Sequence, residues 1–266
     1  MVIKNSAKFV LNKLWQYKRA TYLPRIIYYH SVNAEHPWAH RPEQFRAQMQ
    51  WLFDQGYTCP TLSTFEKHYQ SEKVAFITFD DGYLDNFTHA IPILNEFNFK
   101  ATFFVCSGYI NNPEDVSRHQ LYDGLTMLND THLVEMKKQG MEIGSHGVTH
   151  RMISRLNNGE QYQELLDSKA RLQELISEQV VSFAYPQGQK GAVSNFAHRA
   201  AQQIGYNFIC TTLWGTCHEY ACVLKRCEMS QLDSLADFIA KMTGRRDYRK
   251  YVDALIDKSK VWDKLA

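Results

Sequence analysis

Two histidines four residues apart and a pair of adjacent aspartates are the side chains of this sequence best suited to chemistry. His146 and His150 form an HxxxH spacing. On a helical turn such positions share one face, so both imidazoles could reach a single ion. Asp80 or Asp81 is the natural third ligand, and two histidines with one carboxylate leave positions open for water and substrate. Because consecutive side chains diverge, one aspartate could bind the ion while the other faces the water beside it.

Both features also have a plainer interpretation. The sequence Asp80-Asp81-Gly82 is typical of a turn in which aspartates bond to the local backbone and glycine takes a positive φ. A two-histidine spacing can also arise by chance in a chain with 11 histidines. The plain interpretation must, however, explain why the turn follows a strand-like apolar run and why the histidine pair follows another.

Short apolar runs alternate with helical patterns along the chain. The runs that predict strands are Arg25–Tyr29, Val74–Phe79, Ala101–Cys106, Met141–Ser145, Val180–Tyr185, Tyr206–Thr212 and Val223–Glu228. Helical patterns lie near residues 43–55, 86–97, 131–139, 159–177, 193–204 and 231–242. This alternation predicts an α/β fold with a parallel sheet in a single domain. The polar segment 107–130 predicts a long loop beside the site.

Several predicted strands end in residues that could form a site. In parallel sheets and barrels, chemistry gathers at the carboxyl ends of strands. The groups at these ends are His30, the Asp80-Asp81 pair, His146 and the sequence Tyr185-Pro186-Gln187-Gly188. Four of the seven predicted strand ends therefore converge on one place.

Composition excludes several classes of protein. The chain has 266 residues, of which 44% are hydrophobic and 22% charged, as in ordinary globular proteins. Its apolar runs are shorter than the ~20 residues that span a membrane, and a net charge of +2 does not favour nucleic acid as a partner. The even spacing of Cys217, Cys222 and Cys227 suggests a metal site, but we favour buried, reduced thiols.

The two ends of the chain are basic. We divide the sequence into an N-terminal segment 1–20, a catalytic domain 21–240 and a helical extension 241–266. The first segment carries five basic and no acidic side chains, and its apolar residues would share one side of a helix. This pattern is typical of a basic helix lying on a membrane surface, although it also suits a helix packed on the protein's own body. Since no secretory signal is evident, we expect a cytoplasmic protein, peripheral on the inner face of the membrane.

Three motifs together resemble the polysaccharide deacetylases (carbohydrate esterase family 4). They are Thr78-Phe79-Asp80-Asp81-Gly82, Ser145-His146-Gly147-Val148-Thr149-His150 and Phe183-Ala184-Tyr185-Pro186-Gln187-Gly188, in the family's order and approximate spacing. The likeness covers about residues 24–230. Within the family, the sequence is similar to a branch with a YH motif on its first strand, here Tyr29-His30. The family fold is a distorted (β/α) barrel of about seven parallel strands, in agreement with the strand pattern above.

The resemblance implies a division of roles. Asp81, His146 and His150 would bind one divalent metal ion, often zinc, with nickel, cobalt, iron or manganese as alternatives. Asp80 would be the general base towards a water activated by the metal. A backbone N–H in the segment Tyr185, Pro186 and Gln187 would help to hold the oxyanion.

The general acid and the partner of the base depart from the common family pattern. Many members carry the acid in a late Leu-x-His motif, which this sequence lacks after residue 150. We therefore choose His30 as the acid and keep His218 as the alternative. The third motif has no arginine to orient the base, and we expect Arg226 to restore that contact. Gln187 stands where the branch often has an aromatic residue.

The function implied is a metal-dependent N-deacetylase that hydrolyses the acetamide of an N-acetylhexosamine and releases acetate. Its substrate would be a glycan or glycolipid, such as a cell-envelope polysaccharide or a lipopolysaccharide core precursor. One alternative is a deformylase or amidase acting on a lipid-linked aminosugar or a non-sugar amide. Another is a non-catalytic carbohydrate-binding protein, which the intact Asp80, Asp81, His146 and His150 disfavour.

Overall fold

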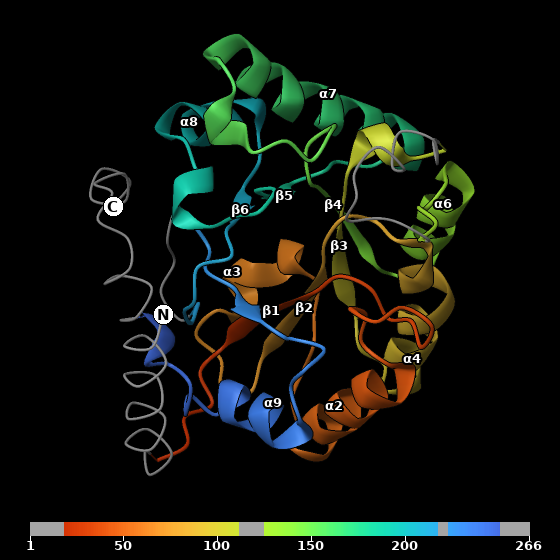
Figure 1. The fold of residues 1–266 in the computed structure, drawn as a ribbon, viewed down its shortest axis with the longest axis vertical. Helices are drawn as coiled ribbons and strands as arrows, with labels where there is room; N and C mark the ends of the chain where they lie inside the picture. Colours follow the sequence, from red (N-terminus) through yellow and green to blue (C-terminus); the bar gives the residue numbers. More distant parts are fainter. Residues whose placement is uncertain (1–18, 112–124, 218–222, 251–266) are drawn as a thin grey trace.

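A seven-stranded parallel sheet forms the centre of the computed structural model, which describes residues 19–111, 125–217 and 223–250 (Figure 1). The strand order is β6-β5-β4-β3-β2-β1-β7. The strands are β1 (Arg25–Tyr29), β2 (Ala75–Phe79), β3 (Ala101–Val105), β4 (Glu142–Ser145), β5 (Ser182–Ala184), β6 (Phe208–Cys210) and β7 (Cys227–Glu228). Every residue of β1 to β6 is buried, as expected for parallel strands covered on both faces.

The two edges of the sheet are joined by backbone hydrogen bonds. The N–H of Thr211 donates to the carbonyl of Leu224 at 2.9 Å, and the N–H of Leu224 donates to the carbonyl of Ile209 at 2.8 Å. These bonds connect the end of β6 to the segment that leads into β7, which itself pairs with β1. The sheet therefore curls into a distorted barrel, and the predicted α/β barrel of seven parallel strands is confirmed.

The longer helices lie around the sheet (Figure 1). The α-helices are α2 (Pro42–Asp54), α3 (Phe65–His68), α4 (Ile91–Glu96), α6 (Asp130–Lys138), α7 (Asn158–Ile176), α8 (Asn195–Ile204) and α9 (Leu235–Met242). A π-helical turn η2 (Asn86–Ala90) leads into α4, and 3₁₀ turns are η1 (Leu62–Thr64), η3 (Ser107–Tyr109), η5 (Ile153–Arg155) and η6 (Lys190–Ala192). Asn157 and Glu160 form a capping box that sets the start of α7.

Alternating side chains of the strands divide into two cores. On β2, Phe76 belongs to an inner cluster, whereas Ile77 and Phe79 belong to the larger outer cluster beneath the helices. Phe65 of α3 packs into the inner cluster, and its ring lies 5.4 Å from that of Phe76. Because Asp80 follows Phe76 by four residues, strand alternation directs its side chain towards the barrel interior.

The predicted strands and helices are present with shifts at their ends. Strands β5, β6 and β7 are shorter than predicted, and the four-residue α3 was not predicted. Parts of several predictions lie outside the described residues: 1–18, 112–124, His218, Cys222 and 251–266. The described cysteines are buried, free thiols, as expected. Within the described ranges, no helix has the length and apolar character needed to cross a bilayer.

Candidate functional site

The predicted site residues meet at the carboxyl end of the sheet. His30 follows β1, the Asp80-Asp81 pair follows β2, and His146 and His150 follow β4. The carboxyl ends of these parallel strands lie at one edge of the sheet. A pocket of about 540 Å³ opens there. Its lining residues are Tyr28, His30, Trp38, Asp80, Asp81, Tyr83, His146, His150, Gln187 and Thr212.

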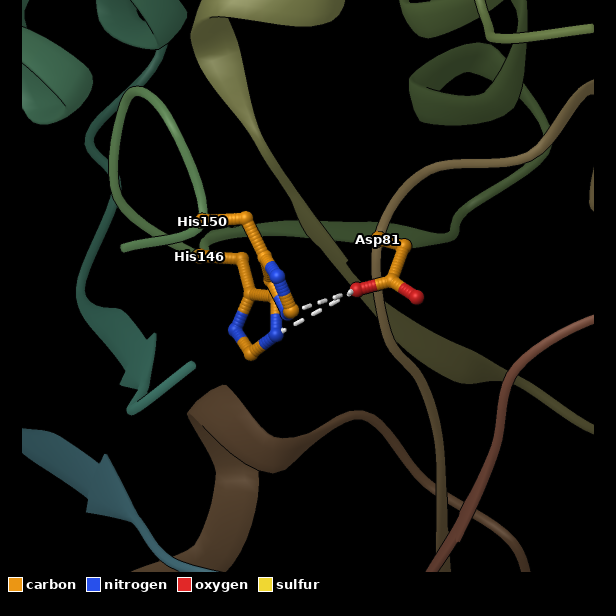
Figure 2. Close-up of side chains that lie close together, drawn as sticks. All are labelled: Asp81, His146 and His150. Atoms are coloured by element: carbon orange, nitrogen blue, oxygen red, sulfur yellow. Dashed lines mark ion pairs between the residues drawn. The ribbon is translucent and has the colours of Figure 1, made fainter. Parts of the chain in front are cut away.

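Asp81, His146 and His150 form a cluster suited to a cation (Figure 2). The Asp81 Oδ1 lies 3.5 Å from His146 Nε2 and 3.3 Å from His150 Nε2. Two ligand atoms that are each about 2.1 Å from a tetrahedral ion lie about 3.4 Å apart, so these separations suit one shared ion. Among the described residues, this is the group of histidine, cysteine or acidic side chains whose ligand atoms approach closely enough to hold a metal.

The hydrogen bonds around the cluster also suit a cation. The Asp81 Oδ1 is buried and accepts no hydrogen bond from the described residues, which is costly for a carboxylate without a cation. The Nδ1 of His146 lies 2.8 Å from the carbonyl of Ala184, an acceptor, so this nitrogen carries the proton and Nε2 presents its lone pair. Burial lowers the pKa of His146 to about 4, so the ring is neutral near pH 7, which is its ligating form.

The two histidines do not share a helical turn, and that part of the prediction was wrong. They lie on a loop that follows β4, in which Gly147 has a φ of 77° and His150 a φ of 56°. Asp81 also has a positive φ, 77°. Left-handed backbone is unfavourable for residues other than glycine. The two imidazoles thus meet through a loop whose backbone is strained at His150. Backbone strain of this kind is commonly concentrated at functional sites.

Asp80 is held by a buried arginine. The guanidinium of Arg226 donates two hydrogen bonds to the Asp80 carboxylate, of 2.6 Å and 2.8 Å. Arg226 also donates to the Thr211 carbonyl and to Thr78 Oγ1, and its guanidinium lies 4.7 Å from the Tyr28 ring centre. The contact expected between Arg226 and the aspartate pair is therefore present, in bidentate geometry.

The arginine determines the charge state of Asp80. Burial alone would raise the pKa of the Asp80 carboxyl, but the adjacent Arg226 guanidinium outweighs it and lowers the pKa to about 2. The same pairing raises the pKa of Arg226 against the effect of its own burial. Asp80 is therefore ionised at neutral pH and its two oxygens are fixed in direction.

His30 lies at the exposed side of the pocket, immediately after β1. Its backbone carbonyl accepts a 2.7 Å hydrogen bond from Asn86 Nδ2. The next residues are held by the buried Asp85, which accepts hydrogen bonds from Ser31 Oγ at 2.5 Å and from the N–H of Val32 at 3.1 Å. The start of the helical segment after β2 thus fixes the position of His30 across the pocket.

The third predicted motif separates into a core residue and a pocket residue. The Tyr185 side chain is fully buried in the outer core, where its ring packs against Phe183 at 4.9 Å. Pro186 follows, and Gln187, with a φ of 63°, reaches the pocket. The Gln187 carbonyl accepts a hydrogen bond from Thr212 Oγ1, which fixes this turn against the segment after β6.

Four pocket residues, Tyr28, Trp38, Tyr83 and Thr212, were not predicted as site residues from the sequence. Trp38 is half-buried, and its ring lies 5.5 Å from that of Tyr83 in an edge-on arrangement. Tyr83 directly follows the motif that contains the aspartate pair, so its place in the chain was a usable signal. Tyr28 lies within one predicted strand and Thr212 ends another, so both had a usable position, whereas nothing in the local sequence of Trp38 indicates a site.

Comparisons with known proteins identify the family of this chain. The family model described as polysaccharide deacetylase matches residues 67–209, which is more than half of the chain. The Bacillus subtilis protein named "Putative polysaccharide deacetylase YxkH" is 30% identical over 192 residues, covering 70% of this chain and 63% of the relative. A peptidoglycan-N-acetylglucosamine deacetylase of Bacillus cereus is 26% identical over 146 residues, covering 54% of this chain and 57% of the relative. The chain thus spans less than two thirds of either relative.

A solved structure supports the fold. The Streptococcus pyogenes deacetylase PplD, determined in complex with acetate, superposes with a TM-score of 0.69 at 23% sequence identity. The superposition covers 85% of this chain and 99% of that one. At this level of identity the likeness establishes a shared fold.

Proposed function

This chain belongs to the polysaccharide deacetylase family, and we propose that it is a metal-dependent N-deacetylase acting on an N-acetylhexosamine in a glycan or glycolipid. One observation carries the proposal: a three-residue cation site and a buried, ion-paired carboxylate lie side by side in one pocket. Amide hydrolysis needs both an electrophilic centre for the carbonyl and a group that accepts a proton from water.

Asp81, His146 and His150 would hold one divalent ion. We propose zinc, because two imidazoles and one carboxylate leave a position open, as in catalytic zinc sites. When bound, the ion supplies Lewis-acid polarisation of the acetamide carbonyl and lowers the pKa of water.

Asp80 would accept the proton of the attacking water. Its carboxylate is ionised at neutral pH, and Arg226 orients both oxygens through bidentate hydrogen bonds. A base in this position must face the pocket, and Asp80 lines it. The pairing with Arg226 also keeps the Asp80 side chain from turning towards the cation ligands beside it.

His30 would donate a proton to the leaving amine. It lines the same pocket, and its backbone is fixed by Asn86. We propose that the backbone N–H at Gln187 stabilises the oxyanion that develops on the acetyl carbonyl. The carbon–nitrogen bond then breaks, the nitrogen takes the proton from His30, and the products are acetate and a free amine.

The pocket chemistry suits a neutral sugar. Tyr28, Trp38 and Tyr83 supply aromatic surface, whereas the charged groups of the pocket are those assigned above to the reaction. The Bacillus cereus relative is named for action on N-acetylglucosamine of peptidoglycan. We propose the same acetamidosugar class here, with the polymer or lipid to which it is attached decided by experiment.

The first test compares cells that make the wild-type protein with cells that make Asp80→Asn. We expect a hexosamine-containing envelope lipid or glycan in the variant cells to be heavier by one acetyl group. The matched control is Asp54→Asn, because Asp54 is an exposed aspartate at the end of α2. Unchanged masses in the Asp80→Asn cells would contradict an envelope glycan substrate, and a species heavier by a formyl group would indicate a deformylase.

The membrane-surface prediction has its own test. We propose that the basic residues 1–20 hold the protein at anionic membrane, at ~1 kcal/mol for each basic residue near the surface. Deleting residues 1–20 should then move the protein from the membrane fraction of disrupted cells to the supernatant. Equal membrane association of the full and shortened chains would contradict this proposal and the inner-face location with it.

A further inference from the structure

The loop that carries His150 is held by a buried acid of α7, Glu164, which belongs to none of the sequence motifs. Glu164 is 4% exposed. We propose that Glu164 is a positioning residue of the cation site: its carboxylate fixes the loop between the two histidines and so sets the place of His150. This inference rests on the proposed function, because it assumes that the cluster of Asp81, His146 and His150 binds a metal.

The Glu164 carboxylate gathers the hydrogen-bond donors of the loop. Its Oε2 accepts from the backbone N–H of Val148 at 2.7 Å and of Thr149 at 3.1 Å. Its Oε1 accepts from Thr149 Oγ1 at 2.5 Å and from the guanidinium of Arg151 at 3.0 Å. Both oxygens are therefore used within the residues that separate and follow the histidines, and Arg151 balances the buried charge.

The carbonyl groups of the same loop are held from the opposite side. The segment η3 supplies the donors, which are the N–H of Ser107 to Gly147, the N–H of Gly108 to Val148 and the hydroxyl of Tyr109 to Thr149, at 3.0, 2.9 and 2.9 Å. The loop is thus fixed between Glu164 on one side and η3 on the other. Since η3 offers donors only to carbonyl groups, Glu164 is the partner that satisfies the N–H groups.

We call the hydrogen bonds of Glu164 and η3 to this loop the clamp, and the clamp explains how His150 keeps its strained backbone. A left-handed residue other than glycine persists only where its surroundings over-determine it. Gly147 permits the clamp, because a Cβ there would lie 3.2 Å from Glu164 Oε2. Without the carboxylate, the N–H groups of Val148 and Thr149 would lose their partner. The loop would then lower its free energy by relaxing to a conformation in which His150 lies farther from Asp81.

A glutamine at position 164 is the sharpest perturbation. It keeps the shape of the side chain but replaces one acceptor oxygen by an NH₂ group, which would face either the N–H groups of Val148 and Thr149 or the guanidinium of Arg151. Loss of a partner that orients metal ligands typically weakens metal affinity 10–100-fold. We expect this loss in Glu164→Gln, with the secondary structure of the metal-free protein unchanged.

The experiment is a titration of metal-stripped, full-length protein with Co²⁺ alone, followed by the visible absorption of the bound ion. The matched control is Glu160→Gln, one turn earlier on α7, where an exposed acid also pairs with Arg151. Circular dichroism of each metal-free variant checks folding. A second variant, Thr149→Val, removes the bond to Oε1 and keeps both backbone bonds to Oε2.

The outcomes separate this inference from the proposed function. A 10–100-fold weaker dissociation constant for Glu164→Gln, a smaller loss for Thr149→Val and an unchanged value for Glu160→Gln would support the clamp. Wild-type affinity in a folded Glu164→Gln would overturn it. If Glu164→Gln does not fold, Thr149→Val decides, and an unchanged affinity there overturns the inference. Failure of the wild-type protein itself to bind Co²⁺ would instead overturn the proposed metal site.

Discussion

Replacing Arg226 by methionine should be among the most costly single changes in this protein. The substitution keeps much of the apolar volume between Tyr28 and Phe104 but leaves the Asp80 carboxylate buried without its counter-charge. Removing one partner of a buried ion pair typically costs ~3–5 kcal/mol. Because domains are stable by only ~5–15 kcal/mol, this is a large share of the total.

The double variant separates the ion pair from the other bonds of the arginine. Asp80→Asn alone also leaves a buried charge, that of Arg226, facing an amide. In the double variant, Asp80→Asn with Arg226→Met, neither charge of the pair remains. We therefore expect its loss of unfolding free energy to be smaller than the sum of the two single losses by ~2 kcal/mol or more. The bond from Arg226 to the Thr211 carbonyl is lost in both arginine variants, so the wild-type stability is not regained.

Urea unfolding of the four metal-free proteins measures this cycle. With a slope of about 3 kcal/mol/M, as expected at the upper end for single domains, Arg226→Met should lower the midpoint by about 1–1.7 M. A midpoint within about 0.3 M of wild type would show that Asp80 has found another partner. Additive single losses, within about 0.5 kcal/mol, would refute the reasoning that the two side chains act as one buried pair.

Three further predictions concern pH, backbone packing and substrate binding. Because burial lowers the pKa of His40 from 6.5 to about 4, the unfolded chain takes up a proton that the folded chain does not, and stability falls as pH drops from 7 to 4. Urea titrations should show that His40→Gln loses about 3 kcal/mol less than wild type over this range, and equal losses would contradict the burial argument. Gly108→Ala places a Cβ 2.5 Å from the Val148 carbonyl oxygen and should lower the unfolding free energy by about 1–3 kcal/mol, whereas Gly191→Ala, with open space around its Cβ, should match wild type in the same assay. Trp38→Ala should raise KM about tenfold with little change in kcat if the ring binds the sugar, and a loss confined to kcat would contradict that role.

The strands and longer helices could be predicted because burial dictates their composition. The run Arg25–Tyr29 is buried throughout and matches β1 residue for residue. Strands β6 and β7 are shorter than their apolar runs because the adjoining residues close the barrel through single backbone bonds instead of a continuous ladder. The helix α3 is too short to show a helical period in its sequence. Its apolar Phe65 packs into the inner cluster of the barrel.

The site was predictable in its residue types but less so in its geometry. His146 and His150 meet at one point, yet through a left-handed loop and not through the helical turn that their spacing suggests. The spacing of residues does not report φ, and the loop conformation depends on Glu164, a partner on another element. Contacts between distant residues, such as Arg226 with Asp80, were expected only from the family resemblance, because 146 residues separate them.

Release of acetate from N-acetylglucosamine oligosaccharides, peptidoglycan fragments and lipid-linked acetamidosugars by the purified full-length chain is the most direct test. Metal-stripped protein, the same protein with Zn²⁺ restored, and Zn²⁺-loaded Asp80→Asn should be compared. We expect Zn²⁺ to restore release of acetate with an equal amount of free amine, and Asp80→Asn to be slower by about 10²-fold or more. Equal acetate release by all three proteins, or glycan binding by the Zn²⁺-loaded wild type without any turnover, would contradict a metal-dependent N-deacetylase.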